Sequence, residues 1–134
     1  MFATNVHGIF HCSKVTIPAM RKKEGGHIIN IASIAGQMGN PQGAGYSGTK
    51  FAVRGMSESM FKELRDYGIK VSCVYPGSTN TNFFDSVEGM DAHQYMMDPK
   101  DVALELVRLL ETSSNFLISD IIFRPLQPKG PKKK

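Results

Sequence analysis

Residues 46–77 read YSGTKFAVRGMSESMFKELRDYGIKVSCVYPG. Their first part predicts a helix over 46–67, because apolar residues recur there at steps of three and four. These residues are Val53, Met56, Met60, Leu64 and Tyr67. Gly68 stands where a helix commonly ends, and the apolar run after it predicts a buried strand over 69–75. The stretch therefore predicts one helix leading into one strand, closed by a Pro-Gly pair.

The same alternation of helix and strand continues on both sides of this stretch. Before it, the sequence predicts a helix over 2–22 and a short buried strand, HIINIAS, over 27–33. After it, residues 101–111 predict an amphipathic helix and residues 117–125 a last strand. This order is typical of an α/β fold, in which right-handed helical crossovers join parallel strands.

Helix ends and loops carry their own signals. Asp98 and Pro99 predict the start of the third helix, since aspartate caps helix N-termini and proline suits the first helical position. Pro18 is expected to kink or loosen the last turn of the first helix. Residues 34–45 hold four glycines and one proline and predict a loop. Because parallel sheets bind ligands beyond the carboxyl ends of their strands, loops of this kind are where site residues are expected.

The composition is that of one soluble globular domain: 134 residues, 41% hydrophobic, 21% charged and 9% aromatic. It excludes a disordered, collagen-like or disulfide-rich protein. Cys12 and Cys73 lie far apart and lack metal-ligand spacing, so we predict neither a disulfide framework nor a zinc site. His7 and His11 are four residues apart, as metal ligands can be, but no acid lies between them and no third ligand is evident. We predict no metal.

The net charge of +4 comes from the C-terminus. Sixteen Lys and Arg face twelve Asp and Glu, and four of the lysines lie in the last six residues, 129–134. We expect these residues to form a basic, disordered tail and predict no nucleic-acid partner. No apolar stretch reaches the length of a membrane span, and the N-terminus is too polar for a signal-peptide core. We therefore expect a cytoplasmic protein without a membrane partner.

Candidate chemistry begins with Tyr46 and Lys50, which are four residues apart and so share one helix face. A tyrosine is a poor acid or base at neutral pH, because its ordinary pKa is about 10. A lysine cation one turn away favours the phenolate and brings a tyrosine into range for proton transfer. Ser33, at the carboxyl end of a predicted strand, precedes Tyr46 by thirteen residues, and Asn5 lies on the preceding helix.

Residues 43–48, GAGYSG, match the GxGxxG pattern of a dinucleotide-binding turn. That pattern has meaning only where a strand runs directly into it. Here the residues before it are GNPQ, and the nearest predicted strand ends ten residues earlier. We interpret these glycines as loop residues around the tyrosine.

Four segments resemble the short-chain dehydrogenase/reductase family. They are NVHGIF around Asn5, GHIINIASIAG around Ser33, YSGTKFAVRG around Tyr46 and Lys50, and VYPGSTNT around Pro76. The resemblance spans nearly the whole chain and stops at the basic tail. It implies a partial Rossmann-like, doubly wound parallel sheet, made of the family's last three strands with their crossover helices.

By the same resemblance, residues 1–128 are expected to be the C-terminal catalytic part of such a domain, lacking the N-terminal dinucleotide-binding half. Strand 27–33 would then have an unpaired, apolar edge. We expect the isolated chain to be marginally stable, oligomeric or dependent on a partner.

The resemblance implies catalytic roles for four residues. Tyr46 would be the general acid in carbonyl reduction and the general base in alcohol oxidation. Lys50 would favour its phenolate and bind the nicotinamide ribose, Tyr46 would contact the cofactor as well, and Ser33 would hold the substrate oxygen. Asn5 would order the water chain that returns the proton. The implied cofactor is NAD or NADP, with NADP slightly favoured.

Further cofactor contacts follow from the fourth segment. Pro76 and Gly77 would flank the nicotinamide, Thr79 would lie near its carboxamide, and Thr81 would reach toward the phosphates. The family resemblance also implies that loop 82–98 covers the substrate. Its aromatic and methionine side chains could line an adaptable apolar pocket, although ordinary packing explains them equally well.

The sequence leaves two functions open. The first is an NAD(P)-dependent oxidoreductase that interconverts a small carbonyl substrate and a secondary alcohol, either as a 3-oxoacyl-thioester reductase or as a general carbonyl reductase. The second is a truncated, non-catalytic fragment that acts as a pairing or regulatory subunit. In either case we expect a homo-oligomer formed through the helices at 2–22 and 46–67.

Overall fold

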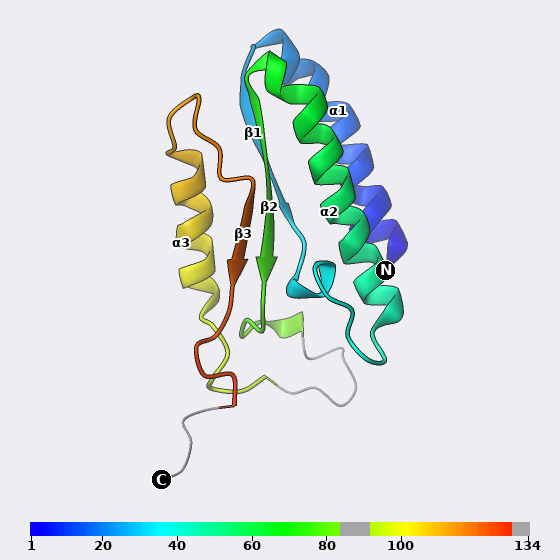
Figure 1. Ribbon diagram of the computed structural model, residues 1–134, viewed down its shortest axis with the longest axis vertical. Coiled ribbons are helices and arrows are strands. Elements are labelled where there is room, and N and C mark those ends of the chain that lie inside the picture. Colours follow the sequence, from blue (N-terminus) through cyan, green and yellow to red (C-terminus); the bar gives the residue numbers. More distant parts are fainter. Residues whose placement is uncertain (84–91, 130–134) are drawn as a thin grey trace.

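The computed structural model describes residues 1–83 and 92–129. Its centre is one parallel sheet of β1 (Gly26–Ile31), β2 (Ile69–Pro76) and β3 (Asp120–Phe123), in that order (Figure 1). The predicted parallel α/β arrangement is confirmed. Within the described residues β1 pairs only with β2, so one of its edges is unpaired, as expected for strand 27–33.

The helix and strand predicted from residues 46–77 are confirmed. The helix α2 (Ala44–Leu64) continues into a short 3₁₀ turn, η3 (Arg65–Tyr67), before β2 begins. Gly68 ends it with a φ of 68°, the left-handed region that favours glycine. A Cβ there would also lie 2.9 Å from the carbonyl oxygen of Glu24.

The start of the third helix is confirmed as well. α3 (Pro99–Leu110) begins after Asp98, whose carboxylate accepts a hydrogen bond from the backbone N–H of Lys100 at 2.8 Å. The first helix covers the predicted range 2–22, but its opening turns have a form that the sequence did not predict. It opens with a π-helix, η1 (Ala3–Gly8), and continues as α1 (Ile9–Lys22) past the proline inside it. No described helix is long and apolar enough to cross a membrane.

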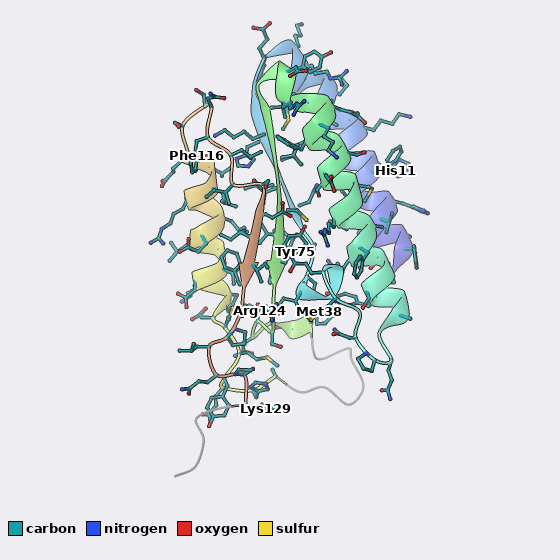
Figure 2. The ribbon with its side chains drawn as sticks, in the orientation of Figure 1. His11, Met38, Tyr75, Phe116, Arg124 and Lys129 are labelled. Carbon is teal, nitrogen blue, oxygen red and sulfur yellow. The ribbon has the colours of Figure 1, made fainter. Side chains whose placement is uncertain are left out.

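Side chains of a strand alternate between the two faces of a sheet. On one face, apolar residues of β2 pack against α1 and α2 in two buried clusters. One holds Ala32, Val53, Cys73 and Tyr75, and the other holds Leu64, Ile69 and Val71. Tyr75, labelled in Figure 2, lies in this layer between β2 and α2. The hydrophobic core thus lies between the sheet and these two helices.

α3 lies on the other face of the sheet. Lys70 Nζ donates hydrogen bonds to Thr112 O at 3.0 Å, Thr112 Oγ1 at 2.9 Å and Ser113 O at 2.7 Å, directly after the end of α3. An ammonium at this end is favoured by the helix dipole. Figure 1 shows α1 and α2 on one side of the sheet and α3 on the other, so the expected doubly wound layering is confirmed.

This layering corrects one expectation. The chain crosses the sheet in one direction, from β1 to β2 and then to β3. The helices α2 and α3, which connect these strands, nevertheless lie on opposite faces. The two connections must therefore have opposite hands. The expectation that every crossover is right-handed, which is the usual arrangement, is wrong for one of them. The contacts of Lys70 with the end of α3 help to hold this helix on its face.

The last strand is shorter than the predicted 117–125. The ladder begins where Cys73 pairs with Asp120 and ends where Pro76 pairs with Phe123. Pro125 follows closely and has no N–H to donate to a ladder.

A hydrogen-bonded group, here called the amino-end network, joins the strands where they begin. It consists of Lys70 with its partners, His27 and Ser72. Ser72 Oγ is buried and donates to Ile118 O at 2.7 Å. A hydroxyl has one hydrogen, so Ser72 must accept from His27 Nε2, 2.8 Å away. Burial lowers the pKa of His27, and the charge of Lys70 lowers it further.

Candidate active site

Tyr46 and Lys50 lie in the first turns of α2 and are both half-buried. The Lys50 ammonium is 5.7 Å from the centroid of the Tyr46 ring, so the two residues share one face as predicted. Lys50 Nζ also donates a hydrogen bond to Ile31 O at 3.1 Å, across to the end of β1. The lysine therefore connects the tyrosine to the carboxyl end of the sheet.

Burial lowers the pKa of Lys50, and the nearby Cys73 opposes this shift. Its ammonium is thus partly removed from water. Electrostatic interactions are stronger where water is displaced, so this cation acts more strongly on a neighbouring oxygen than an exposed lysine would.

Ser33 lies two residues beyond β1 and caps the short 3₁₀ helix η2 (Ile34–Gly36). Its Oγ accepts a hydrogen bond from Ala35 N at 3.1 Å, which leaves the hydroxyl hydrogen free to be donated elsewhere. The loop then packs directly on α2, since a Cβ at Gly36 would lie 2.7 Å from Lys50 O. This close approach brings Ser33 to the same end of the sheet as Lys50.

Asn5 belongs to η1 and reaches the same turn of α2 through a threonine. Asn5 Nδ2 donates to Thr49 Oγ1 at 3.1 Å, and Thr49 Oγ1 donates to Tyr46 O at 2.8 Å. Thr49 is fully buried. No role was predicted for this residue from the sequence, although a threonine between Tyr46 and Lys50 in a predicted helix was an available signal.

The Pro-Gly pair lies beside the Ser33 loop. Gly77 N donates to Phe123 O at 2.8 Å, and a Cβ on Gly77 would lie 2.9 Å from Ile34 Cδ1. Thr79 is half-buried and donates to Gly77 O at 3.0 Å. Pro76, Gly77 and Thr79 are therefore grouped close to Ser33.

Thr81 lies farther along the chain and is exposed. Its Oγ1 accepts from Phe83 N at 3.4 Å. The Phe83 ring lies 5.9 Å from the Tyr46 ring, so this segment approaches the tyrosine. Two loop residues predicted to cover a substrate, Phe84 and Met90, lie outside the described residues.

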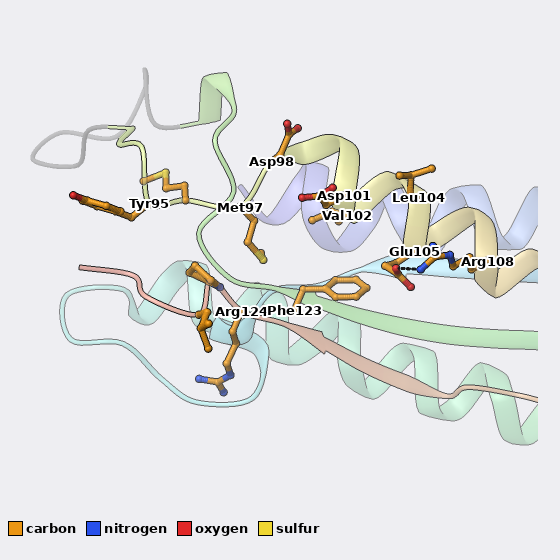
Figure 3. A pocket seen from close by; sticks show the side chains of 13 residues that line it. Tyr95, Met97, Asp98, Asp101, Val102, Leu104, Glu105, Arg108, Phe123 and Arg124 are labelled. Atoms are coloured by element: carbon orange, nitrogen blue, oxygen red, sulfur yellow. Dashed lines mark hydrogen bonds and ion pairs between the residues drawn. The ribbon is translucent and has the colours of Figure 1, made fainter. Parts of the chain in front are cut away.

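A pocket of about 550 Å³ lies between α3, residues 95–98 and residues 123–126 (Figure 3). The loop 82–98 contributes to this pocket through residues such as Met97. The backbone N–H of Met97 donates to Ser78 O at 3.0 Å, and its carbonyl accepts from Asn80 N at 2.9 Å. The pocket lining includes Tyr95, Met96 and Met97. Ser33, Tyr46 and Lys50 do not line it.

The GAGYSG pattern opens α2, with Gly43 as its N-cap. Residues before it form turns, including Gln42 at a φ of 62°, and no strand leads into it. The pattern is therefore not a dinucleotide-binding turn that follows a strand, as predicted, but the interpretation of its glycines as loop residues is wrong for Gly45 and Gly48, which lie inside α2. Among residues 1–83 and 92–129, no group of three or more His, Cys, Asp or Glu is placed to hold a metal ion.

Known proteins resemble this chain in sequence and in fold. A family model described as short chain dehydrogenase matches residues 1–92. A 3-ketodihydrosphingosine reductase of Bacteroides thetaiotaomicron is 40% identical over 108 residues, which are 81% of this chain and 40% of that protein. A 3-oxoacyl-[acyl-carrier-protein] reductase of Synechocystis is 36% identical over 113 residues, 81% of this chain and 45% of that protein. The chain spans less than half the length of both relatives.

A solved structure described as the closed form of serine dehydrogenase complexed with NADP+ superposes with a TM-score of 0.88. It is 25% identical, and the match covers 100% of this chain and 58% of the other. The three-stranded sheet with helices on both faces is therefore an arrangement that a known oxidoreductase shares.

Proposed function

The chain belongs to the short-chain dehydrogenase family, and from that membership we propose that it forms the catalytic part of an NAD(P)-dependent oxidoreductase that interconverts a carbonyl compound and a secondary alcohol. One observation carries the proposal. Tyr46 and Lys50 share one face at the start of α2, and Lys50 bonds to the end of β1. Asn5 bonds to Thr49 in the same turn of α2, and the loop that begins at Ser33 packs on the backbone of Lys50.

The donors at this end suit a nicotinamide nucleotide. Lys50 has three ammonium hydrogens, of which one points to Ile31 O, so others remain for ribose hydroxyls. Thr79 donates its hydrogen to Gly77 O, so its oxygen can accept from a carboxamide. When bound, the nucleotide supplies or accepts the hydride. We favour NADP over NAD, because the serine dehydrogenase structure is described with NADP+.

In reduction, Tyr46 donates its hydroxyl proton to the carbonyl oxygen as the general acid. Ser33 donates a hydrogen bond to the same oxygen and holds it within reach. The Lys50 cation favours the phenolate that remains, and Asn5 orders the water chain that returns the proton. In oxidation, the same residues act in reverse. A positioned acid of this kind contributes about 10²–10⁴-fold to a rate.

For the substrate, we favour a 3-oxo compound with an apolar chain over a small ketone. Two relatives support this choice by name, a 3-ketodihydrosphingosine reductase and a 3-oxoacyl-[acyl-carrier-protein] reductase. Met96 and Met97, which line the pocket between α3 and residues 123–126, offer an adaptable apolar surface for such a chain.

A pairing or regulatory subunit is the second candidate. The unpaired edge of β1 supports it, since Ile31 there remains 42% exposed. Apolar side chains on the outer surfaces of α1 and α2 are exposed as well, which supports self-association through these helices. They are Phe10, Val15 and Phe51.

The test uses the protein isolated from its own cells, with its intact mass recorded. Oxidation of NADPH and NADH is followed against a panel of 3-oxoacyl thioesters and simple ketones. We expect Tyr46→Phe to abolish turnover and to leave nucleotide binding intact. Tyr67→Phe, at the far end of the same helical segment, is the matched control. Turnover that survives Tyr46→Phe would refute the proposed role, and a native protein that reduces no carbonyl compound would favour the pairing subunit.

A further inference from the structure

Thr49 lies between Tyr46 and Lys50, but on the inner side of α2. Its side chain is fully buried, and its hydroxyl is used in both directions. It donates to Tyr46 O at 2.8 Å and accepts from Asn5 Nδ2 at 3.1 Å. The Asn5–Thr49 bond joins residues 44 positions apart in the sequence. One hydroxyl therefore links η1 to the turn that carries Tyr46.

The same helix contains a second buried hydroxyl that bridges two elements by donating one hydrogen bond and accepting another. Ser57 Oγ is buried, donates to Val53 O at 2.7 Å and accepts from Asn30 Nδ2 at 2.9 Å. It lies two turns beyond Lys50, in the core. The two bridges differ in what they hold: Ser57 connects α2 to the sheet, whereas Thr49 connects two elements that each carry a residue of the proposed site.

We propose that Thr49 is a positioning residue, whose buried hydroxyl fixes Asn5 on η1 and Tyr46 on α2 in one relative position for proton transfer. The inference rests on the proposed oxidoreductase function. Thr49 does not touch the reacting atoms; it acts through the Tyr46 carbonyl and the Asn5 amide.

The local conformation of η1 gives this bond its importance. Asn5 lies inside a six-residue π-helix, a rare form that occurs mostly as single turns and often at functional sites. The bond to Thr49 comes from outside this π-helix and holds the side chain of Asn5 toward α2.

The identity of residue 49 supports the same conclusion. Threonine is a weak helix former, because its branched side chain loses freedom against the preceding turn. Valine has nearly the same shape and would fill the same buried space without a polar atom. A hydroxyl at this buried position is satisfied because both of its partners are present, and one of them is Asn5.

The experiment compares Thr49→Val with Thr49→Ser and with Ser57→Ala in the protein as its cell makes it. Thr49→Val keeps the shape and loses both hydrogen bonds, and Thr49→Ser keeps the hydroxyl. Ser57→Ala removes the other bridge, so that it controls for general loosening of α2. Turnover, KM, the pH profile of kcat/KM and the unfolding midpoint are measured for each variant.

We expect Thr49→Val to lower kcat by about 10- to 100-fold, since misplacement of a reacting group by 1 Å costs on the order of 100-fold. KM should change little, the pH profile should shift, and Thr49→Ser should restore both. Ser57→Ala should lower the unfolding midpoint and leave kcat within about twofold. The inference is overturned if Thr49→Val leaves kcat unchanged or if Ser57→Ala lowers it equally.

A second measurement separates this inference from the proposed function. NMR resonances of the Tyr46 ring and of the Asn5 side-chain amide report the positions of these groups without any turnover. Thr49→Val should move both sets, and Ser57→Ala should leave both in place. If the native protein reduces no carbonyl compound, the proposed function fails, and unmoved resonances in Thr49→Val would overturn the positioning role independently.

Discussion

The two ends of the sheet use similar side chains for different purposes. At the amino end, the Lys70 ammonium donates hydrogen bonds to three oxygen atoms, and the Ser72 hydroxyl both donates and accepts a hydrogen bond. At the carboxyl end, Lys50 donates a hydrogen bond to Ile31 O within the described residues. Ser33 Oγ accepts a hydrogen bond from Ala35 N, and its own hydroxyl hydrogen remains available. Polar groups with remaining hydrogen-bonding capacity thus distinguish the candidate site from an equally polar structural end.

The two lysines give the sharpest test of this comparison. Lys50→Met should lower turnover by about 10²–10⁴-fold, because it removes the cation beside the general acid. It should not lower the unfolding midpoint. Burial lowers the pKa of Lys50, so at neutral pH its charge is held at a cost to the folded state. Steady-state rates measure the loss of turnover, and thermal melting measures the unfolding midpoint. A large loss of stability in Lys50→Met would contradict the proposed difference between the two ends of the sheet.

Lys70→Met should have the opposite effect. Losing charged hydrogen bonds to Thr112 and Ser113 should lower the free energy of unfolding by about 1.5–3 kcal/mol. Turnover should be unchanged at temperatures where the protein is folded. Lys62→Met is the matched control, since Lys62 forms an exposed ion pair with Glu58 that adds little. Urea unfolding measures the difference between the two variants.

Packing at the carboxyl end should tolerate no added methyl group at Gly36. In Gly36→Ala the new Cβ would lie 2.7 Å from Lys50 O, a backbone atom that cannot swing aside. We expect a loss of about 1–3 kcal/mol in stability and a fall in turnover as the Ser33 loop shifts. Gly39→Ala is the control, because nothing lies within 4 Å of its added Cβ. Equal melting curves for the two variants would contradict the close packing of this loop.

The smallest expected effect is a pH dependence at the amino end. The folded state lowers the pKa of His27 below its ordinary 6.5, first by burial and then by the charge of Lys70. The unfolded chain therefore binds this proton more readily, so stability is complete above about pH 6.5 and declines as the pH falls below it. Urea unfolding from pH 7 to pH 5 should show a shallower decline in His27→Gln than in the native sequence. An unchanged slope would exclude His27 as its source.

Local signals made much of the fold predictable from the sequence. The spacing of apolar residues located α2, and Gly68 marked its end because the chain there needs a left-handed residue close to Glu24. The Asp98 cap located α3 for an equally local reason. The opposite hand of the α3 connection was not predictable, because right-handed crossovers are the usual arrangement and the contacts of Lys70 that help to hold α3 involve residues 42 and 43 positions away.

The candidate site shows the same division. The four-residue spacing predicted that Tyr46 and Lys50 share a face. The bridge from Asn5 through Thr49 was not predicted, since it joins distant residues and involves a π-helix that has no simple sequence pattern. Apolar periodicity indicates which helix face is buried, but it does not reveal which buried hydroxyl meets which amide.

The crossing of α3 on the far face has a consequence for how the molecule opens. In the described part of the chain, α3 and β3 contact the remaining elements mainly along β2, through a four-residue ladder, the hydrogen bonds of Lys70, and those of Ser72 and Tyr75 with residues 118 and 120, with one more bond from Gly77 N to Phe123 O. The core between the sheet and the helices α1 and α2 lies on the other face. Residues 98–123 can therefore act as a separate cooperative unit, whose local unfolding exposes its amides to solvent exchange while the turn carrying Tyr46 stays folded.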